Sequence, residues 1–402
     1  MSAVIQSAVP AAVAKPTGKL ESIQMGRAIA VMMVVFYHLL TLSREYQHGR
    51  FAAPWMEILA GGVDVFFVIS GIVMVLTTWN RLEKKGTASR FMVHRISRIY
   101  PPYLTLTILL TPIWLKYPNK INASHGGVSL LGSYTLIPTG KLPLVGVAWS
   151  LSYEMMFYLI FFVILCFVKR AYLRASLLTW GGAVVTAALI RLAVPTETIR
   201  SLPAIGQFLL KPFPVEFIAG CLLALAFLKG PLRWWRQAIV ASLVGFVAVG
   251  IVLQVSPTAN ELVIERPDFR ILLYALPSVL LVYGLLQMGR EKAAARIPRL
   301  AVLCGDASYS IYMVHILVIH AAYRLVRHMP GPGAKIAFLA GTLAVALGSS
   351  IVFYRLVEKP FSRWARQGLE KIFSGARSPR EPEAARVVVM AEPQAEMSAP
   401  GS

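Results

Sequence analysis

Long apolar runs separated by short basic segments dominate this chain. A helix needs about 20 apolar residues to cross the hydrocarbon core of a bilayer. Ten windows approach that length: 26–42, 56–79, 99–116, 149–168, 173–194, 205–227, 237–254, 269–288, 302–326 and 334–357. The fifth and sixth are the weakest, because Arg191, Lys211 and Pro214 interrupt them. The pattern predicts an all-α integral membrane protein, a bundle of about ten transmembrane helices.

The distribution of basic residues predicts how the bundle is oriented. Lys and Arg gather after the second, fourth, sixth and eighth runs and after the last one, whereas the alternate connections contain fewer of them or mix them with acidic residues. Because Lys and Arg concentrate in cytoplasmic loops, both termini are expected in the cytoplasm. We expect a cytoplasmic segment at 1–21, a membrane domain at 22–364 and a cytoplasmic tail at 365–402. The tail turns to Ser, Pro, Glu and Ala from about 375, a composition typical of disorder.

Composition supports the membrane interpretation and limits the classes of function. Charged residues make up 15% of the chain and apolar residues 56%, whereas soluble domains carry about 25% charged residues. The net charge of +21 is spread over short clusters without a nucleic-acid-binding motif, so no nucleic-acid partner is expected. Cys166, Cys221 and Cys304 have neither metal-type spacing nor an obvious pairing. We expect them to be small buried apolar side chains, and we expect no metal site.

Two ionisable residues occur in the first apolar run. Arg27 and His38 are eleven residues apart, which on an α-helix places them on one face, about 16 Å apart along the axis. Arg27 can be an end charge that reaches the membrane surface, and His38 can be a hydrogen-bonding group between helices. Ionisable groups inside a membrane are costly, however, and they often mark functional sites.

Further ionisable residues lie in other apolar runs. Asp64 and Glu154 are expected at a depth similar to that of His38, in the outer half of the membrane. A histidine beside a carboxylate is a general-base pair that can activate a hydroxyl group. The alternative is a buried polar network that holds helices together. Other candidates of this kind are Glu216, Asp306, His315 and His320.

Arg95 and Arg98 precede the third apolar run. They are three residues apart, so on a helix they would present two guanidinium groups to one phosphate or pyrophosphate. The alternative is a topology signal that contacts lipid phosphates. Spacing alone leaves both open.

Several ordered motifs together resemble the integral-membrane acyltransferase family 3. The resemblance covers Ser22 to about Trp364. It includes Arg27 with His38, GGVDVFFVISG at 61–71, Arg95 with Arg98 before Tyr100-Pro101, WSLSYEMMFY at 149–158, GDASYSIYMVH at 305–315, and Val357-Glu358-Lys359-Pro360. The family includes O-acetyltransferases that act on bacterial exopolysaccharide, O-antigen and Nod-factor sugars.

The resemblance implies a ten-helix enzyme of the bacterial plasma (inner) membrane. It would take an acyl group, usually acetyl, from cytoplasmic acyl-CoA and deliver it to a hydroxyl of a cell-surface polysaccharide or a lipid-linked precursor. His38 would be catalytic, Arg27 essential, and Arg95 and Arg98 would help hold the CoA phosphates. Acetyl-CoA would be a substrate, with no tightly bound cofactor.

Helix geometry adds a mechanism to this resemblance. The separation of about 16 Å between Arg27 and His38 matches the reach of an extended pantetheine arm. We expect Arg27, Arg95 and Arg98 to hold the CoA phosphates at the cytoplasmic end, while the thioester extends toward His38. We expect His38, oriented by Glu154 or Asp64, to deprotonate the sugar hydroxyl, with a covalent acyl-histidine as a variant. The segment at about 117–148 is expected to face the acceptor or to form a re-entrant segment. The rival readings are a proton-coupled secondary transporter, or an acyltransferase with succinyl or longer donors or a small-molecule acceptor.

Overall fold

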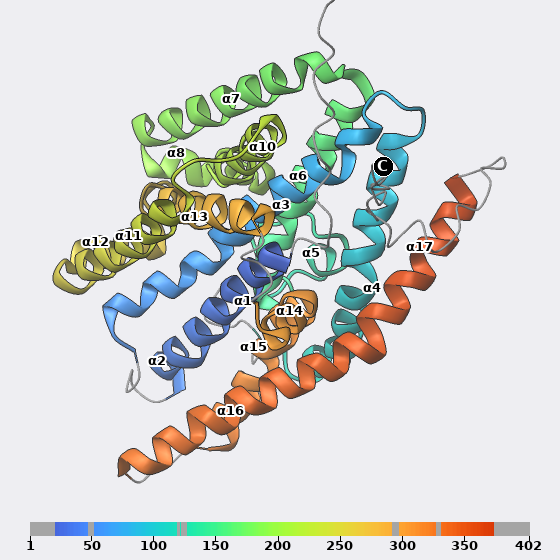
Figure 1. Ribbon diagram of the computed structural model, residues 1–402. Coiled ribbons are helices and arrows are strands. Elements are labelled where there is room, and N and C mark those ends of the chain that lie inside the picture. Colours follow the sequence, from blue (N-terminus) through green and yellow to red (C-terminus); the bar gives the residue numbers. More distant parts are fainter. Residues whose placement is uncertain are drawn as a thin grey trace, which may run out of the picture.

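The predicted all-α architecture is confirmed. The computed structural model describes residues 21–46, 52–118, 121, 127–291, 297–326 and 331–373, and the predicted disordered tail lies outside these ranges. Within them there is no strand, and the extended pairing is limited to one isolated bridge between Val128 and Leu142. The first elements are α1 (Glu21–Thr41), α2 (Ser43–Tyr46), η1 (Pro54–Gly61), α3 (Gly62–Thr78), η2 (Trp79–Arg81), α4 (Thr87–Lys116), α5 (Leu130–Thr135), η5 (Gly146–Ala148), α6 (Trp149–Phe167), η6 (Arg170–Tyr172) and α7 (Leu173–Ala193) (Figure 1).

The second half of the chain continues the bundle. Its elements are α8 (Thr196–Ser201), α9 (Ala204–Leu209), α10 (Pro214–Lys229), α11 (Trp235–Val255), α12 (Pro257–Glu265), α13 (Pro267–Arg290), α14 (Arg299–Asp306), α15 (Ser308–Leu325), α16 (Gly331–Phe353), the π-helical segment η8 (Tyr354–Glu358) and α17 (Lys359–Phe373). Helices therefore occupy all ten predicted ranges.

Seven helices of the described part are long and apolar enough to cross a membrane, or eight if the bent pair α14–α15 counts as one span. This makes the chain a multi-pass membrane protein. Of the predicted spans, α4 carries a basic first half and three prolines, and α10 has only 16 residues. The count of about ten spans and the side of the termini remain predictions.

In three of the predicted ranges the helix is broken, bent or extended, which hydropathy does not predict. The sixth is broken between α9 and α10, and the ninth bends by 77° between α14 and α15. The last run continues through η8 and across Pro360 into α17, as one long helix along the edge of the bundle (Figure 1). The π-helical turn just before Pro360 breaks the regular hydrogen-bond ladder at the point where proline lacks an N–H donor.

The bundle has central and peripheral helices. Helix α1 lies at the centre and packs against α3, α13, α14 and α15 (Figure 1). In the most apolar 18-residue stretch of the span Pro54–Arg81, 72% is buried within the protein, whereas the corresponding share is only 17% in each of the spans Arg170–Ala193 and Gly331–Ile372. Exposed apolar side chains on the peripheral helices are what a lipid-facing surface requires.

The cysteine prediction is correct for two residues and wrong for the third. Cys221 and Cys304 are buried, but Cys166 is exposed near the end of α6. An apolar run in a membrane protein can face lipid as well as the core, so hydropathy alone does not distinguish the two environments.

Candidate active site

Two cavities inside the bundle share three arginine side chains. Arg27 from α1 and Arg95 and Arg98 from α4 line both of them. The inner cavity has a volume of about 80 Å³ and is lined by parts of α1, α3, α4, α6 and α15, including Ser70, Glu154 and Tyr312. The basic cavity has a volume of about 680 Å³ and is lined by α1, α3, α4, η2, α14, η8 and α17.

Arg95 is buried but keeps donor capacity. Its Nη2 donates to Thr77 Oγ1 at 3.2 Å, and its guanidinium carbon lies 5.3 Å from the Phe91 ring centroid and 5.4 Å from that of Tyr158. Its Nε has no hydrogen-bond partner among the described residues. A buried guanidinium beside two aromatic rings, with an unused N–H donor, is suited to an anionic ligand.

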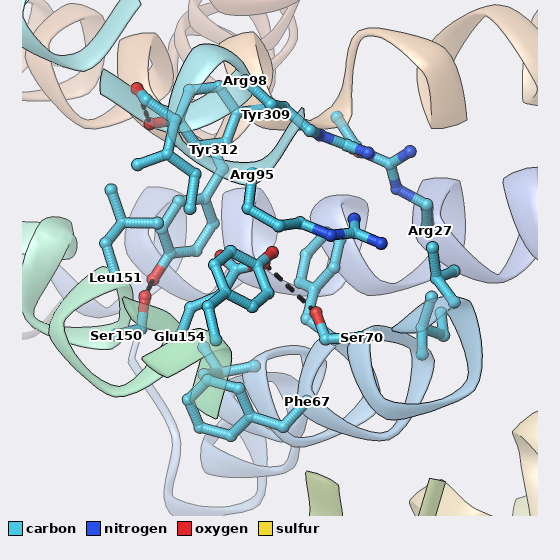
Figure 2. Close-up of a pocket in the computed structure, with 17 residues that line it drawn as sticks. Arg27, Phe67, Ser70, Arg95, Arg98, Ser150, Leu151, Glu154, Tyr309 and Tyr312 are labelled. Atoms are coloured by element: carbon cyan, nitrogen blue, oxygen red, sulfur yellow. Dashed lines mark hydrogen bonds between the residues drawn. The ribbon is translucent and has the colours of Figure 1, made fainter. Parts of the chain in front are cut away.

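Arg27 and Arg98 complete the set. Arg27 Nη1 donates to Gln24 Oε1 at 3.3 Å on its own helix. Arg98 lies three residues after Arg95 on α4, so the prediction that they are neighbours on one helix is confirmed. Figure 2 shows the three guanidinium groups gathered on one side of the inner cavity, with Ser150 and Leu151 on the other.

The basic cavity carries a strong positive charge. Five further cations join the three shared arginines in its lining, namely Arg81, Arg90, Lys359, Arg363 and Arg366, against the carboxylates of Asp306 and Glu358. Three of the five lie on α17, which packs along α4. Such an excess of cations in a cavity attracts polyanions.

Two carboxylates in these cavities are anchored by hydroxyl groups. Glu154 Oε1 accepts hydrogen bonds from Ser70, at 3.2 Å, and from Tyr158. Glu358 Oε2 accepts from the backbone N–H of Ser310 at 3.1 Å and from its hydroxyl group at 2.5 Å. Glu154 interacts electrostatically with Arg27 and Arg95, so its carboxylate offsets part of the positive charge of the shared arginines.

His38 lies outside the lining of both cavities. Its Nδ1 is 3.0 Å from the carbonyl oxygen of Val34 and 3.1 Å from Nε2 of His315. The His315 ring is 6.1 Å from that of Tyr312, a residue that lines the inner cavity. A chain of ring contacts thus connects the inner cavity to His38 through Tyr312 and His315.

The structure does not place His38 against the predicted carboxylates. Within the described part of the chain, Asp64 Oδ2 pairs with Arg270 Nη2 at 2.5 Å, and Glu154 bonds Ser70 and Tyr158. Asp64 is fully buried and lines neither cavity. Its catalytic role, like that of Glu154, remains a prediction.

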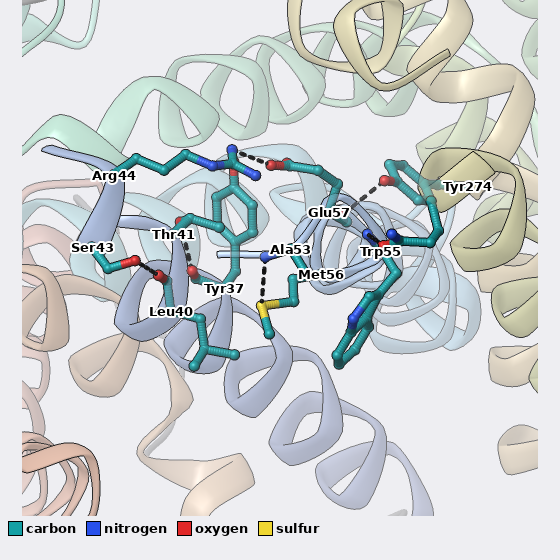
Figure 3. A network of polar contacts seen from close by, with 11 residues as sticks. Tyr37, Leu40, Thr41, Ser43, Arg44, Ala53, Trp55, Met56, Glu57 and Tyr274 are labelled. Atoms are coloured by element: carbon teal, nitrogen blue, oxygen red, sulfur yellow. Dashed lines mark hydrogen bonds and ion pairs between the residues drawn. The ribbon is translucent and has the colours of Figure 1, made fainter. Parts of the chain in front are cut away.

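A polar network fixes α2, the short helix that follows α1. Arg44 Nη1 pairs with Glu57 Oε1 at 2.6 Å, and the Tyr274 hydroxyl donates to the Glu57 carbonyl oxygen at 2.8 Å. Figure 3 shows these contacts joining α2, η1 and α13.

Several residues of the site were not singled out from the sequence. They are Ser70, Tyr158, Tyr312, Ser310, Arg363 and Arg366. Most of them lie inside the quoted motifs, so a search for every polar side chain within an apolar run would have found them. His315 was noticed there, but its contact with His38 was not. Among the described residues no group of three or more His, Cys, Asp or Glu side chains is arranged to hold a metal ion.

Comparison with known proteins assigns a family to this geometry. A family model described as "Acyltransferase domain" matches residues 20–355. The exopolysaccharide production protein ExoZ of Rhizobium meliloti (strain 1021) is 30% identical over 320 residues, covering 76% of this chain and 90% of that protein. The acyltransferase MdmB of Streptomyces mycarofaciens is 27% identical over 333 residues, covering 75% and 80%. No solved structure matches the chain.

Proposed function

The chain belongs to this family of membrane acyltransferases, and from that premise we propose that it moves an acetyl group from cytoplasmic acetyl-CoA to a hydroxyl of a cell-surface polysaccharide or of its lipid-linked precursor. Family membership favours the enzyme over the transporter. The similarity to a protein named for exopolysaccharide production supports the choice of acceptor.

The observation that carries the proposal is the meeting of two cavities at Arg27, Arg95 and Arg98. CoA has a phosphorylated, highly charged end and a long neutral arm. The cations of the basic cavity suit the phosphates of CoA. The inner cavity is lined largely by apolar side chains, which suit the neutral arm. The shared arginines would hold the pyrophosphate at the junction.

The 3′-phosphate of CoA would lie further from the inner cavity. Arg363 and Arg366 line the basic cavity but not the inner one, so they are the cations suited to this second phosphate group. The basic cavity would open to the cytoplasm, the side that the distribution of Lys and Arg favours for the same segments.

His38 would act as the general base at the far end of the arm. It is on the same continuous helix as Arg27, which keeps the separation of about 16 Å along the axis. His38 Nε2 takes the proton of the acceptor hydroxyl while the oxygen attacks the thioester carbonyl carbon. The carbon–sulfur bond then breaks, and His38 gives the proton to the CoA thiolate that leaves. Attack by His38 itself, giving an acyl-histidine, is the covalent variant.

The donor half of this proposal is tested by acetyl-CoA binding to the purified full chain in lipid nanodiscs. Arg98→Gln is expected to weaken binding by about 10-fold or more, because hydrogen bonds to charged groups contribute about 1.5–3 kcal/mol. Arg366→Gln is expected to weaken binding of CoA but not of dephospho-CoA. Arg200→Gln is the matched control, since Arg200 is exposed and pairs with exposed Glu197. Equal affinity for all four proteins, or no binding at all, would contradict the proposal.

A further inference from the structure

His38 and His315 contact each other with a defined pattern of donors and acceptors. His315 Nδ1 is 2.8 Å from the Ile311 carbonyl oxygen, and His38 Nδ1 is 3.0 Å from the Val34 carbonyl oxygen. A carbonyl oxygen only accepts hydrogen bonds, so in both rings the Nδ1 atom carries the proton.

In the hydrogen bond between the two rings, His38 is then the donor and His315 the acceptor. In a neutral His315 with its proton on Nδ1, the Nε2 atom has a free lone pair. That atom lies 3.1 Å from His38 Nδ1, so the His38 N–H is shared between Val34 and His315. This leaves the lone pair of His38 on Nε2, the atom that a base or nucleophile must use.

We propose that His315 is the positioning residue for His38, holding it in the Nδ1–H tautomer; this rests on the proposed function of His38. From the sequence we expected Asp64 or Glu154 to orient His38, and in this proposal a histidine has that role. His315 is fully buried, and its backbone bond to Ile311 and its packing against Tyr312 keep its ring from turning. The other titratable groups that face the pair are Tyr37, against the His38 ring, and His320.

His315 also has a role once His38 has taken a proton. Protonation at Nε2 makes His38 an imidazolium, whose Nδ1–H is a stronger donor to the lone pair of His315. Hydrogen bonds with a charged partner are roughly twice as strong as neutral ones. His315 therefore stabilises the protonated form without adding a permanent charge to the membrane interior.

Variants of His315 test the proposal with membranes that carry the full chain, radiolabelled acetyl-CoA and the polysaccharide of the host cells. His315→Ala is expected to lower the maximal transfer rate by about 10²-fold, the scale of a misplaced catalytic group, with unchanged half-saturating acetyl-CoA. His315→Gln keeps an acceptor oxygen and is expected to restore the rate to within about 10-fold of wild type. His315→Glu favours the imidazolium of His38, so the acid limb of the pH–rate profile is expected to move to higher pH.

Equal rates for wild type and His315→Ala at equal protein amounts would overturn the proposal, and so would equal losses in the Ala and Gln variants when both still bind acetyl-CoA. Nitrogen NMR of the histidine-labelled full chain reads the tautomer of His38 without any transfer, with the signal assigned by its loss in His38→Ala. An Nδ1–H signal in wild type that is lost in His315→Ala supports the proposal. An Nε2–H signal in wild type overturns it, and so does an Nδ1–H signal that persists in His315→Ala, because the Val34 carbonyl would then hold the tautomer alone. No transfer by wild type would count against the proposed function, while the NMR result would still decide on His315.

Discussion

Arg270 is the basic partner of two buried acidic side chains, Asp64 near the start of α3 and Glu216 near the start of α10. Its Nη2 pairs with Asp64 and also donates to the Ala60 carbonyl oxygen at 2.8 Å. Glu216 lies fully buried beside Asp64 and Arg270. The Asp64 carboxyl group therefore depends on Arg270 as its charged partner.

Arg270→Ala is therefore expected to destabilise the protein strongly. Removing one partner of a buried ion pair costs about 3–5 kcal/mol, since the remaining charge stays buried. A much lower melting temperature in detergent, compared with wild type, would show this. Arg200→Ala is the control: its exposed pair with Glu197 is worth about 0–1 kcal/mol, so the melting temperature should hardly change.

Asp64→Asn distinguishes a structural from a catalytic Asp64. We expect it to lower the melting temperature and to lower transfer only as far as folded protein is lost. Normal stability combined with abolished transfer would instead support the catalytic role that the sequence suggested.

The sequence allowed single polar residues in the membrane to be recognised but not their partners. Arg27 and His38 were placed on one helix from spacing alone, because that relation is local. The pairing of His38 with His315, 277 residues away, depends on how α1 packs against α15. Similar depth in the membrane suggested that Asp64 and Glu154 were near His38, but depth does not specify which way a side chain points around its helix.

At the scale of helices, small residues allow the central helices to approach closely. A Cβ atom on Gly71 would overlap the Phe217 carbonyl oxygen, and one on Gly220 would overlap that of Val68, so each helix of the α3–α10 pair has a glycine against the other's backbone. Lipid is as apolar as the core, so helices in membranes associate largely through such close packing.

Gly71→Ala and Gly220→Ala are expected to separate α3 from α10. A backbone carbonyl cannot swing aside as a flexible side chain can, so the expected destabilisation is about 1–3 kcal/mol or more. Gly182→Ala on α7 and Gly341→Ala on α16 are matched controls, because nothing lies within 4 Å of a Cβ atom built at either position. Melting curves of the four variants check this, and equal curves for both pairs would contradict the packing argument.

Hydropathy predicted where the helices occur better than what shape they take. Each of the ten apolar ranges contains helix, because apolar length is a property of the sequence window itself. The 77° bend between α14 and α15 and the continuation of the last helix past Pro360 were not predicted. Both depend on neighbouring helices and on a local π-helical turn, to which an average over a window is insensitive.

Across the whole molecule, the proposed path of the acyl group follows one helix. Helix α1 carries Arg27 at the junction of the two cavities and His38 near its other end, and it lies at the centre of the bundle. In the proposed orientation CoA enters and leaves on the cytoplasmic side while the acetyl group alone passes to the acceptor. The central helices therefore hold the candidate site, and the peripheral helices face the lipid.

The most direct test of this account is transfer of label from radiolabelled acetyl-CoA into polysaccharide by membranes that carry wild type, His38→Ala or Arg200→Ala in equal amounts. Arg200 is the control because it is exposed and pairs with exposed Glu197. The account predicts label with wild type and Arg200→Ala, and a loss of about 10²-fold or more with His38→Ala, the scale of a lost general base. Equal label with wild type and His38→Ala would contradict the central role of His38.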